Sequence, residues 1–351
     1  MEWFLQYIVF LAQTVTVVIA ILVVFLFILV QRKKSAPQGS LEIKDLTLEY
    51  QDVKENMQLS IMSEAEAKQF HKTQKKTKKR EKKQAKQAQK IPTQAQDTDA
   101  DNPPEKSTCY VLSFNGSVDA HEVEDLRQEV SAVLSVIKPQ DKVVLKLESP
   151  GGVVHGYGLA ASQLMRFRQR DIHLTAIVDK VAASGGYMMA CTANKIIAAP
   201  FAIVGSIGVV AQIPNFHRLL KKNEIDVELQ TAGQYKRTLT MFGENTEEGR
   251  KKFQQELEET HLLFKDFVAE NRPNLNIDEV ATGEHWFALQ AKDKGLVDEI
   301  GTSDDVILSM IEQHKIIAVK YQRRKKLADR FAKNVVSGVE KLFFRNSRTI
   351  Y

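Results

Sequence analysis

Residues 142–152 read KVVLKLESPGG, and this stretch decides the fold. The run at 142–147 has the composition of a strand, and it leads into Ser149-Pro150-Gly151-Gly152. A Pro-Gly-Gly sequence forms a tight turn whose bare backbone can approach a ligand closely. The sequence therefore predicts a strand followed by a turn that either holds an oxyanion on two adjacent N–H groups or only reverses the chain.

Strands and helices alternate on both sides of this stretch. Apolar residues recur on one helical face from Val123 to Ile137, and short β-branched runs separate the helical segments. The expected strands are 108–114, 142–147, 173–178 and 195–199, and the expected helices are 123–137, 156–169 and a small-residue helix from Ser184. Such a βαβ series predicts an α/β domain with helices packed on largely parallel strands.

A serine between small residues follows the third strand. The sequence VAASGGY at 181–187 places Ser184 at the start of the small-residue helix, where the helix dipole favours developing negative charge. Gly185 and Gly186 leave room for a substrate carbonyl beside the hydroxyl. The pattern predicts a serine nucleophile, although a serine at this position can also serve only as a helix N-cap.

A serine nucleophile needs a base, and two residues are candidates. His155 follows the Gly-Gly turn, and Lys236 lies 52 residues after Ser184 in the sequence GQYKR. A lysine can act as a base when desolvation lowers its pKa from ~10.4 to about 8, at a cost of roughly 3 kcal/mol. The residues alone leave the choice open, because Lys236 is also compatible with an ordinary surface position.

The first residues predict a membrane anchor. Residues 8–30 contain only three polar side chains, and as a helix they span about 34 Å at ~1.5 Å per residue, against a hydrocarbon core of ~30 Å. A cleaved signal peptide has a shorter apolar run behind a basic start, whereas this run follows Glu2. We therefore expect a stub at 1–7 and one transmembrane helix at 8–30. The basic residues at 32–34 favour a cytoplasmic location for the rest of the chain.

Residues 31–106 are expected to connect this anchor to the α/β domain. Leu46, Tyr50, Val53 and Met57 have the spacing of an amphipathic helix, and residues 71–90 hold ten Lys or Arg against one acidic residue. The chain as a whole has a net charge of +5, so its basic character is local. The basic run either spaces the domain from the membrane or docks on anionic lipid. No aromatic residue interleaves the lysines, so no nucleic acid partner is expected.

The end of the chain, 319–351, is a second basic amphipathic segment. Apolar residues recur there at intervals of three and four from Leu327 to Leu342, among many Lys and Arg. Such a helix lies on an anionic membrane or packs on a partner, and a frayed tail is the alternative.

Composition limits the chemistry. The 351 residues are 43% hydrophobic, enough for a substantial core. Cys109 and Cys191 form no C-x-x-C pair, so we expect two buried thiols rather than a disulfide scaffold or a zinc site. The chain has no glycine-lysine phosphate loop and no H-E-x-x-H motif, so we expect no nucleotide cofactor and no metal.

Four linked motifs resemble the signal peptide peptidase A family of Ser-Lys peptidases. They are SPGG at 149–152, VAASGGYMMA at 181–190, VGSIGVV at 204–210 and GQYKRTLT at 233–240, and the similarity extends over about 107–315. The resemblance implies a Clp-protease/crotonase-like domain at 107–318 behind the transmembrane helix. It also implies Ser184 as nucleophile, Lys236 as general base, N–H groups of Gly151 and Gly152 for the oxyanion, and Ser206 as partner of the lysine ammonium.

Further expectations about assembly and location also come from this resemblance. Larger family members carry two fused copies of the domain, whereas this chain has one, so a ring must come from separate subunits and the dyad can be shared between them. The resemblance implies a bacterial inner-membrane protein acting on unfolded or membrane-released peptides, and single-anchor relatives face the periplasm, against the charge count. The rival functions are a crotonase-like acyl-CoA enzyme and a catalytically inert membrane scaffold.

Overall fold

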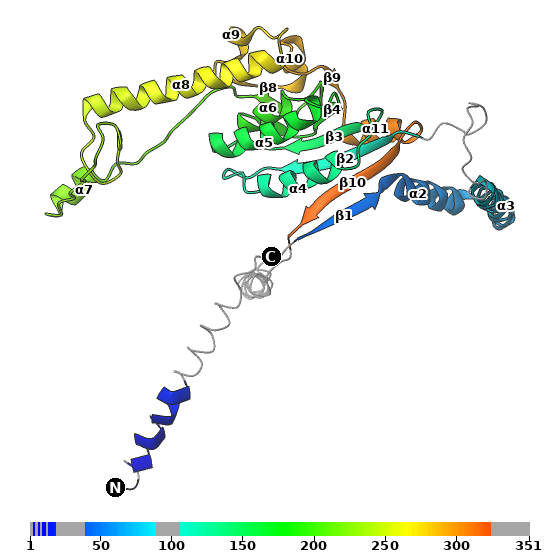
Figure 1. Cartoon of the computed structure of the whole chain (residues 1–351), viewed down its shortest axis with the longest axis horizontal. Helices are drawn as coiled ribbons and strands as arrows, with labels where there is room; N and C mark the ends of the chain where they lie inside the picture. The colour runs from blue at the N-terminus through cyan, green and yellow to red at the C-terminus, as the bar shows by residue number, and fades with distance from the viewer. Residues whose placement is uncertain are drawn as a thin grey trace, which may run out of the picture. The chain divides into compact units, whose positions relative to one another are not determined.

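The computed structural model describes residues 3, 6–7, 9–11, 13–18, 39–88 and 106–323 (Figure 1). Much of the predicted anchor at 8–30, most of 91–106 and the tail from 324 onward lie outside these residues. Within the described ranges, no helix is both long and apolar enough to cross a membrane.

The described chain is a mixed α/β fold, as the alternating pattern predicts. The strands are β1 (Ser40–Asp45), β2 (Thr108–Asn115), β3 (Lys142–Glu148), β4 (His173–Val178), β5 (Val181–Ala183), β6 (Lys195–Ala198), β7 (Ile203–Gly205), β8 (His285–Phe287), β9 (Glu299–Ile300) and β10 (Lys315–Gln322). The helices are α2 (Leu46–Ile61), α3 (Glu64–Ala88), α4 (Val123–Leu134), α5 (Val154–Arg168), α6 (Gly185–Ala190), α7 (His217–Lys222), α8 (Glu247–Asn271), α9 (Ile277–Val280), α10 (Ala288–Asp293) and α11 (Ser303–Ile311).

A seven-stranded sheet forms the centre of the fold, with strand order β1-β10-β2-β3-β4-β6-β9. The pairs β10–β2, β2–β3, β3–β4, β4–β6 and β6–β9 are all parallel, which confirms the prediction of largely parallel strands. Parallel neighbours require crossover segments, and α4 and α5 are two of these, lying side by side along the sheet in Figure 1.

Apolar side chains cover both faces of this sheet. On one face Leu112, Phe114 and Leu145 belong to the large core that includes the buried residues of α4, α5 and α6. On the other face Val111 and Val144 belong to a smaller core with residues of α11 and α2. The alternation follows from the period of two along each strand.

Part of the expected connector belongs to the sheet and its cover. Residues 40–45 form the edge strand β1 rather than a linker, and Leu46 and Tyr50 at the start of α2 pack against the smaller core. The physical reason is that this face of the sheet is apolar and needs a cover beyond α11. The same amphipathic helix leaves Val53, Met57 and Ile61 exposed further along.

A second, three-stranded sheet positions the chemistry. Its order is β5-β7-β8, with β5 parallel to β7 and β7 antiparallel to β8. A parallel bridge between Ser149 and Ala182 joins the end of β3 to β5. The small sheet therefore adjoins the large one at the SPGG turn.

Residues 209–246 leave the body of the domain as an arm, defined here by these limits. Almost all of its side chains are exposed, and it contains the short helix α7. The arm returns at Thr246, whose hydroxyl caps α8 by accepting the N–H of Gly249 over 3.1 Å. In α8 the residues buried in the large core, Phe264 and Val268, lie in the second half, so its first half extends away from the core (Figure 1).

An ion pair ties α8 to the sheet. Arg272, at the end of α8, donates to both carboxylate oxygens of Asp298 at 2.6 and 2.9 Å, and Asp298 also accepts the N–H of Ile196 at 2.7 Å. Burial alone raises the pKa of Asp298, but the hydrogen bonds from Arg272 and Ile196 outweigh it and hold the pKa below its usual value.

We predict that Asp298→Asn lowers the free energy of unfolding by about 2 kcal/mol at pH 7, because it leaves the Arg272 charge without its partner. A carboxyl group with a depressed folded-state pKa contributes stability above its unfolded pKa of ~3.9, and this contribution is lost as pH falls through the lower folded-state value. Urea unfolding of the parent and of Asp298→Asn should therefore show a difference in unfolding free energy that becomes smaller in acid.

Asp226→Asn is the matched control. Its partner Lys221 lies 2.9 Å away, but both side chains are largely exposed, and a solvated pair contributes little. The unfolding midpoint of this variant should equal that of the parent chain. Equal losses in the two variants would contradict the role given to Asp298.

Candidate active site

Three strand ends converge on one place in the fold. The N–H of Ser149, after β3, donates to the Val181 carbonyl over 2.8 Å, and the N–H of Ala183 donates back to the Ser149 carbonyl over 3.0 Å. On the other side of β5, the N–H of Ser184 donates to the Gly205 carbonyl over 2.8 Å. These backbone bonds bring the SPGG turn, Ser184 and Ser206 together.

Ser184 has an unusual conformation. It precedes α6 with φ of 52° and ψ of −119°, a region that non-glycine residues rarely occupy. Its hydroxyl makes no capping hydrogen bond to α6. The N-cap alternative therefore does not describe this serine, and its Oγ is available for other chemistry.

Two backbone donors flank Ser184. Within the described part of the chain, neither the N–H of Gly152 nor that of Gly185 has a hydrogen-bond partner, and Gly185 is the first residue of α6. The N–H of Gly151 differs, because it donates to Ser149 Oγ over 3.1 Å. The pair with free N–H groups is therefore Gly152 and Gly185, rather than Gly151 and Gly152 as expected from the sequence.

The turn has no space for side chains. Gly151 has φ of 89°, and a Cβ at this position would lie 2.6 Å from the Cβ of Ser184. A Cβ at Gly152 would lie 2.0 Å from the carbonyl oxygen of Val118. Glycine at both positions is thus a requirement of the close approach between the turn, Ser184 and the loop that carries Val118.

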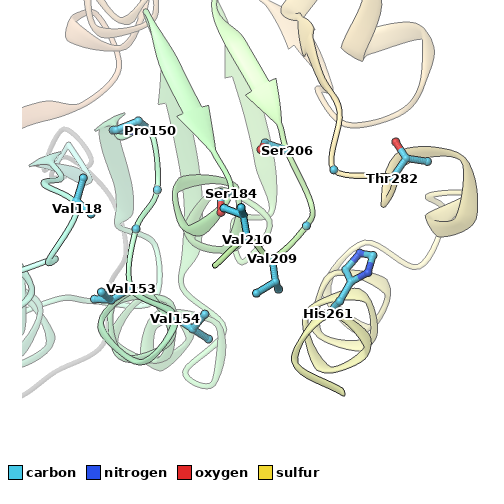
Figure 2. A pocket seen from close by; sticks show the side chains of 14 residues that line it. Val118, Pro150, Val153, Val154, Ser184, Ser206, Val209, Val210, His261 and Thr282 are labelled. Carbon is cyan, nitrogen blue, oxygen red and sulfur yellow. The ribbon is translucent and has the colours of Figure 1, made fainter. Parts of the chain in front are cut away.

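Ser184 and Ser206 line an open pocket of about 790 Å³ (Figure 2). Its walls are mostly glycine and valine, with Val118 and Val153 on one side and Thr282 on the other. A smaller side pocket next to Ser184 is lined by Val154, Met188, Val209, Thr260 and Phe264 with three glycines. The site is apolar around a few polar groups, as is typical of ligand pockets.

His261 also lines this pocket, and the sequence analysis did not single it out. It lies on α8 with Nε2 3.2 Å from the Ile207 carbonyl oxygen, and Figure 2 shows its ring on the pocket wall near Thr282. A signal was present in the sequence, because His261 precedes the core residues Phe264 and Val268 by three and seven positions on the same helical face. His155, the histidine considered from the sequence, is exposed on α5 and is not among the residues that line the pocket.

Lys236 is not part of this pocket within the chain. It is an exposed residue of the arm. Its neighbours contact the first turns of α8: Gln234 donates to Glu248 over 3.5 Å, and Lys252 lies 5.5 Å from the centre of the Tyr235 ring. The pocket residue His261 lies nine residues after Lys252 on α8, which corresponds to about 14 Å along the helix axis at ~1.5 Å per residue. The structure thus brings together Ser184, Gly151, Gly152, Gly185 and Ser206, but not Lys236.

Thiol chemistry is excluded at this site, and the described residues offer no metal site. Cys109 and Cys191 are fully buried, and burial raises the pKa of each thiol to about 12, so both behave as the small hydrophobes that the sequence predicts. Among the residues that the structure describes, no group of three or more His, Cys, Asp or Glu is arranged to hold a metal ion.

Most of the sequence matches one family of peptidases. The N-terminal profile of peptidase family S49 matches residues 2–164, and the peptidase family S49 profile matches residues 166–317. The chain therefore belongs to peptidase family S49 and is a member of a class of proteases.

Curated relatives are similar over nearly the full length. "Probable protease SohB" of Haemophilus influenzae is 52% identical over 97% of this chain and 95% of the relative, and "Probable protease SohB" of Buchnera aphidicola from Schlechtendalia chinensis is 53% identical over 88% and 100%. A solved structure of the 1510-N membrane-bound stomatin-specific protease overlaps with a TM-score of 0.41, at 11% identity over 66% of this chain and 99% of that one.

We predict that Gly152→Ala lowers peptide hydrolysis by at least about 100-fold, because the new Cβ must displace either the turn or the Val118 carbonyl and so moves a candidate oxyanion donor. The measurement is the rate constant kcat on a quenched fluorescent peptide, with circular dichroism to confirm the fold.

Gly158→Ala provides the control with the same chemical change. Gly158 lies in α5, and a Cβ there meets nothing within 4 Å. This variant should keep full activity and gain up to about 1 kcal/mol of stability, since alanine is the better helix former. Full activity in Gly152→Ala would rule out a tight oxyanion turn.

Proposed function

We propose that this chain is a membrane-anchored serine endopeptidase that uses a Ser184–Lys236 dyad to hydrolyse unfolded or membrane-released peptides. The observation that carries the proposal is the geometry of Ser184: a strained residue with an uncommitted hydroxyl, next to the unpaired N–H groups of Gly152 and Gly185. Membership of peptidase family S49 supports the reaction class.

In this proposal the reaction follows acyl transfer. A neutral base takes the proton of Ser184 as its Oγ attacks the peptide carbonyl carbon, and the resulting oxyanion accepts hydrogen bonds from Gly152 and Gly185. The protonated base then gives its proton to the leaving amine as the C–N bond breaks. Water activated by the same base hydrolyses the acyl-enzyme and releases Ser184.

The base is Lys236 of a neighbouring copy of the chain. Two observations support this assignment: Lys236 is exposed on the arm, and it does not line the pocket of its own chain. The arm also exposes apolar side chains, including the stacked Phe216 and Phe242 rings, which favours burial against another subunit. Ser206, which lines the same pocket, is the proposed hydrogen-bond partner of the incoming ammonium. The assembly is then a homo-oligomeric ring.

The side pocket suggests which peptides are cleaved. Because Met188, Val209 and Phe264 lie around a narrow space beside Ser184, a small or apolar side chain next to the scissile bond fits best. Fragments of membrane segments have such side chains. The apolar run at 8–30 would hold the enzyme as a single-pass protein of the bacterial inner membrane, where these fragments are released.

The test is activity in mixed assemblies of Ser184→Ala and Lys236→Ala chains. Each variant alone should lack peptide hydrolysis. In a 1:1 co-assembled mixture, an intact serine meets an intact lysine at about one interface in four of a closed ring, so roughly a quarter of the parent activity should return.

Each other result has a distinct meaning. Background activity from a verified mixed oligomer would contradict sharing of the dyad and favour a base within the chain. Unchanged hydrolysis in pure Ser184→Ala would contradict Ser184 as the nucleophile, whereas no hydrolysis above background by the parent chain would favour an inert scaffold.

The pH profile distinguishes Lys236 from His261 as the base. With lysine, kcat/KM should still rise past pH 7.5, whereas a histidine with a pKa near ~6.5 produces a curve that is flat above about pH 7. We expect a rising curve, and we expect its shape to persist in His261→Gln. His155→Ala, altered at an exposed position of α5, is the control and should reproduce the parent profile. A flat profile would contradict the lysine assignment.

A further inference from the structure

A chain of hydrogen bonds runs beneath the proposed oxyanion donors. The N–H of Gly151 donates to Ser149 Oγ over 3.1 Å, Ser149 Oγ lies 2.5 Å from the Tyr157 hydroxyl oxygen, and the Tyr157 hydroxyl donates to the Ser117 carbonyl over 2.8 Å. Because the single hydroxyl proton of Tyr157 goes to Ser117, the Ser149 hydroxyl must donate to Tyr157. Ser149 Oγ then accepts from the N–H of Gly151, and each of the three donated protons has one acceptor.

This series of hydrogen bonds is shielded from water. Both Ser149 and Tyr157 are 0% exposed. Burial is the largest influence on the Tyr157 hydroxyl and raises its pKa, so the hydroxyl keeps the proton that it donates to Ser117. In a dry environment an unpaired polar group is costly, which makes the arrangement specific.

Tyr157 is also connected to three of the segments that form the pocket. Its ring lies under the start of α6, where a Cβ at Gly185 would be 2.3 Å from the ring atom Cγ. Its hydroxyl reaches Ser117, and the next residue, Val118, accepts the N–H of Val153 over 2.9 Å. One side chain on α5 therefore connects the glycine turn, the start of α6 and the loop that carries Val118.

We propose that Tyr157 is a positioning residue that acts through Ser149. The hydrogen bond from Gly151 to Ser149 turns the first N–H of the glycine pair away from the pocket and fixes the peptide plane that follows. The N–H of Gly152 is thereby held for the oxyanion without a side-chain competitor. This inference rests on the proposed function of Ser184 and adds the element that orients its oxyanion donor.

The experiment compares Tyr157→Phe and Ser149→Ala with the parent in the full chain. Tyr157→Phe keeps the ring but removes the hydroxyl, and Ser149→Ala removes the acceptor for Gly151. We expect each to lower kcat by about 10- to 100-fold, with KM changed less than about twofold, because an oxyanion donor acts in the transition state. The affinity for a peptide boronic acid, which forms a tetrahedral adduct with the serine, should fall by the same factor as kcat. The kcat of the double variant should equal that of the more impaired single variant, because both substitutions interrupt the same series of hydrogen bonds.

Tyr187→Phe is the matched control. Tyr187 is also 0% exposed, and its hydroxyl also donates to a backbone carbonyl, but this carbonyl belongs to Leu296, at 3.0 Å, and not to the loop at Ser117. Both phenylalanine variants should lower the thermal unfolding midpoint, and Tyr187→Phe should keep the parent kcat. Parent kcat in Tyr157→Phe, or equal loss of kcat in both tyrosine variants, would overturn the inference. If Tyr157→Phe does not fold, parent kcat in Ser149→Ala overturns it instead. Because Ser184→Ala tests the nucleophile separately, failure of the proposed function is recognised independently.

Discussion

The backbone ladder between Ser149 and the strand Val181–Ala183 is the constraint on which the site depends. Two backbone hydrogen bonds, at 2.8 and 3.0 Å, connect Ser149 at the end of β3 to β5 of the small sheet. They fix the distance between the glycine turn and Ser184, which must be within reach of one carbonyl group of a substrate. The glycine at 151 follows from the ladder, since a Cβ there would meet Ser184, whereas the glycine at 152 follows from the close approach of the Val118 backbone.

The pairing on the other side of β5 explains the strained serine. The pairing of β5 with β7 continues to Ser184 N–H and the Gly205 carbonyl, while α6 must begin at the next residue and turn into the core. A residue between a fixed strand and a fixed helix has to absorb the change of direction, and Ser184 does so with a positive φ. The buried residues of α6, Tyr187 and Met189 among them, supply the apolar contacts that offset this strain.

Local patterns in the sequence were sufficient for the central strands and for the motifs at their ends. The runs at 108–114, 142–147 and 173–178 match β2, β3 and β4 within a residue, because buried parallel strands need a continuous apolar composition. The placement of β1 beside β10 was not predictable in this way, since the two strands are almost 300 residues apart and β1 is largely exposed. The contact of His261 with Ile207 depends on packing between distant segments, and the Ser149–Tyr157 contact, although it joins residues eight positions apart, depends on how α5 folds back on the turn. The position of Lys236 on an arm is a property of the three-dimensional path of the chain, and its sequence spacing from Ser184 is compatible with several paths.

The two buried thiols have a consequence for where this fold can operate. Cys109 and Cys191 are unpaired and fully buried, and neither ionises in the neutral range. The described domain thus draws no stability from a disulfide and exposes no reactive sulfur to an oxidant. Its folding is therefore equally compatible with the reducing interior of a cell and with an oxidising compartment outside it.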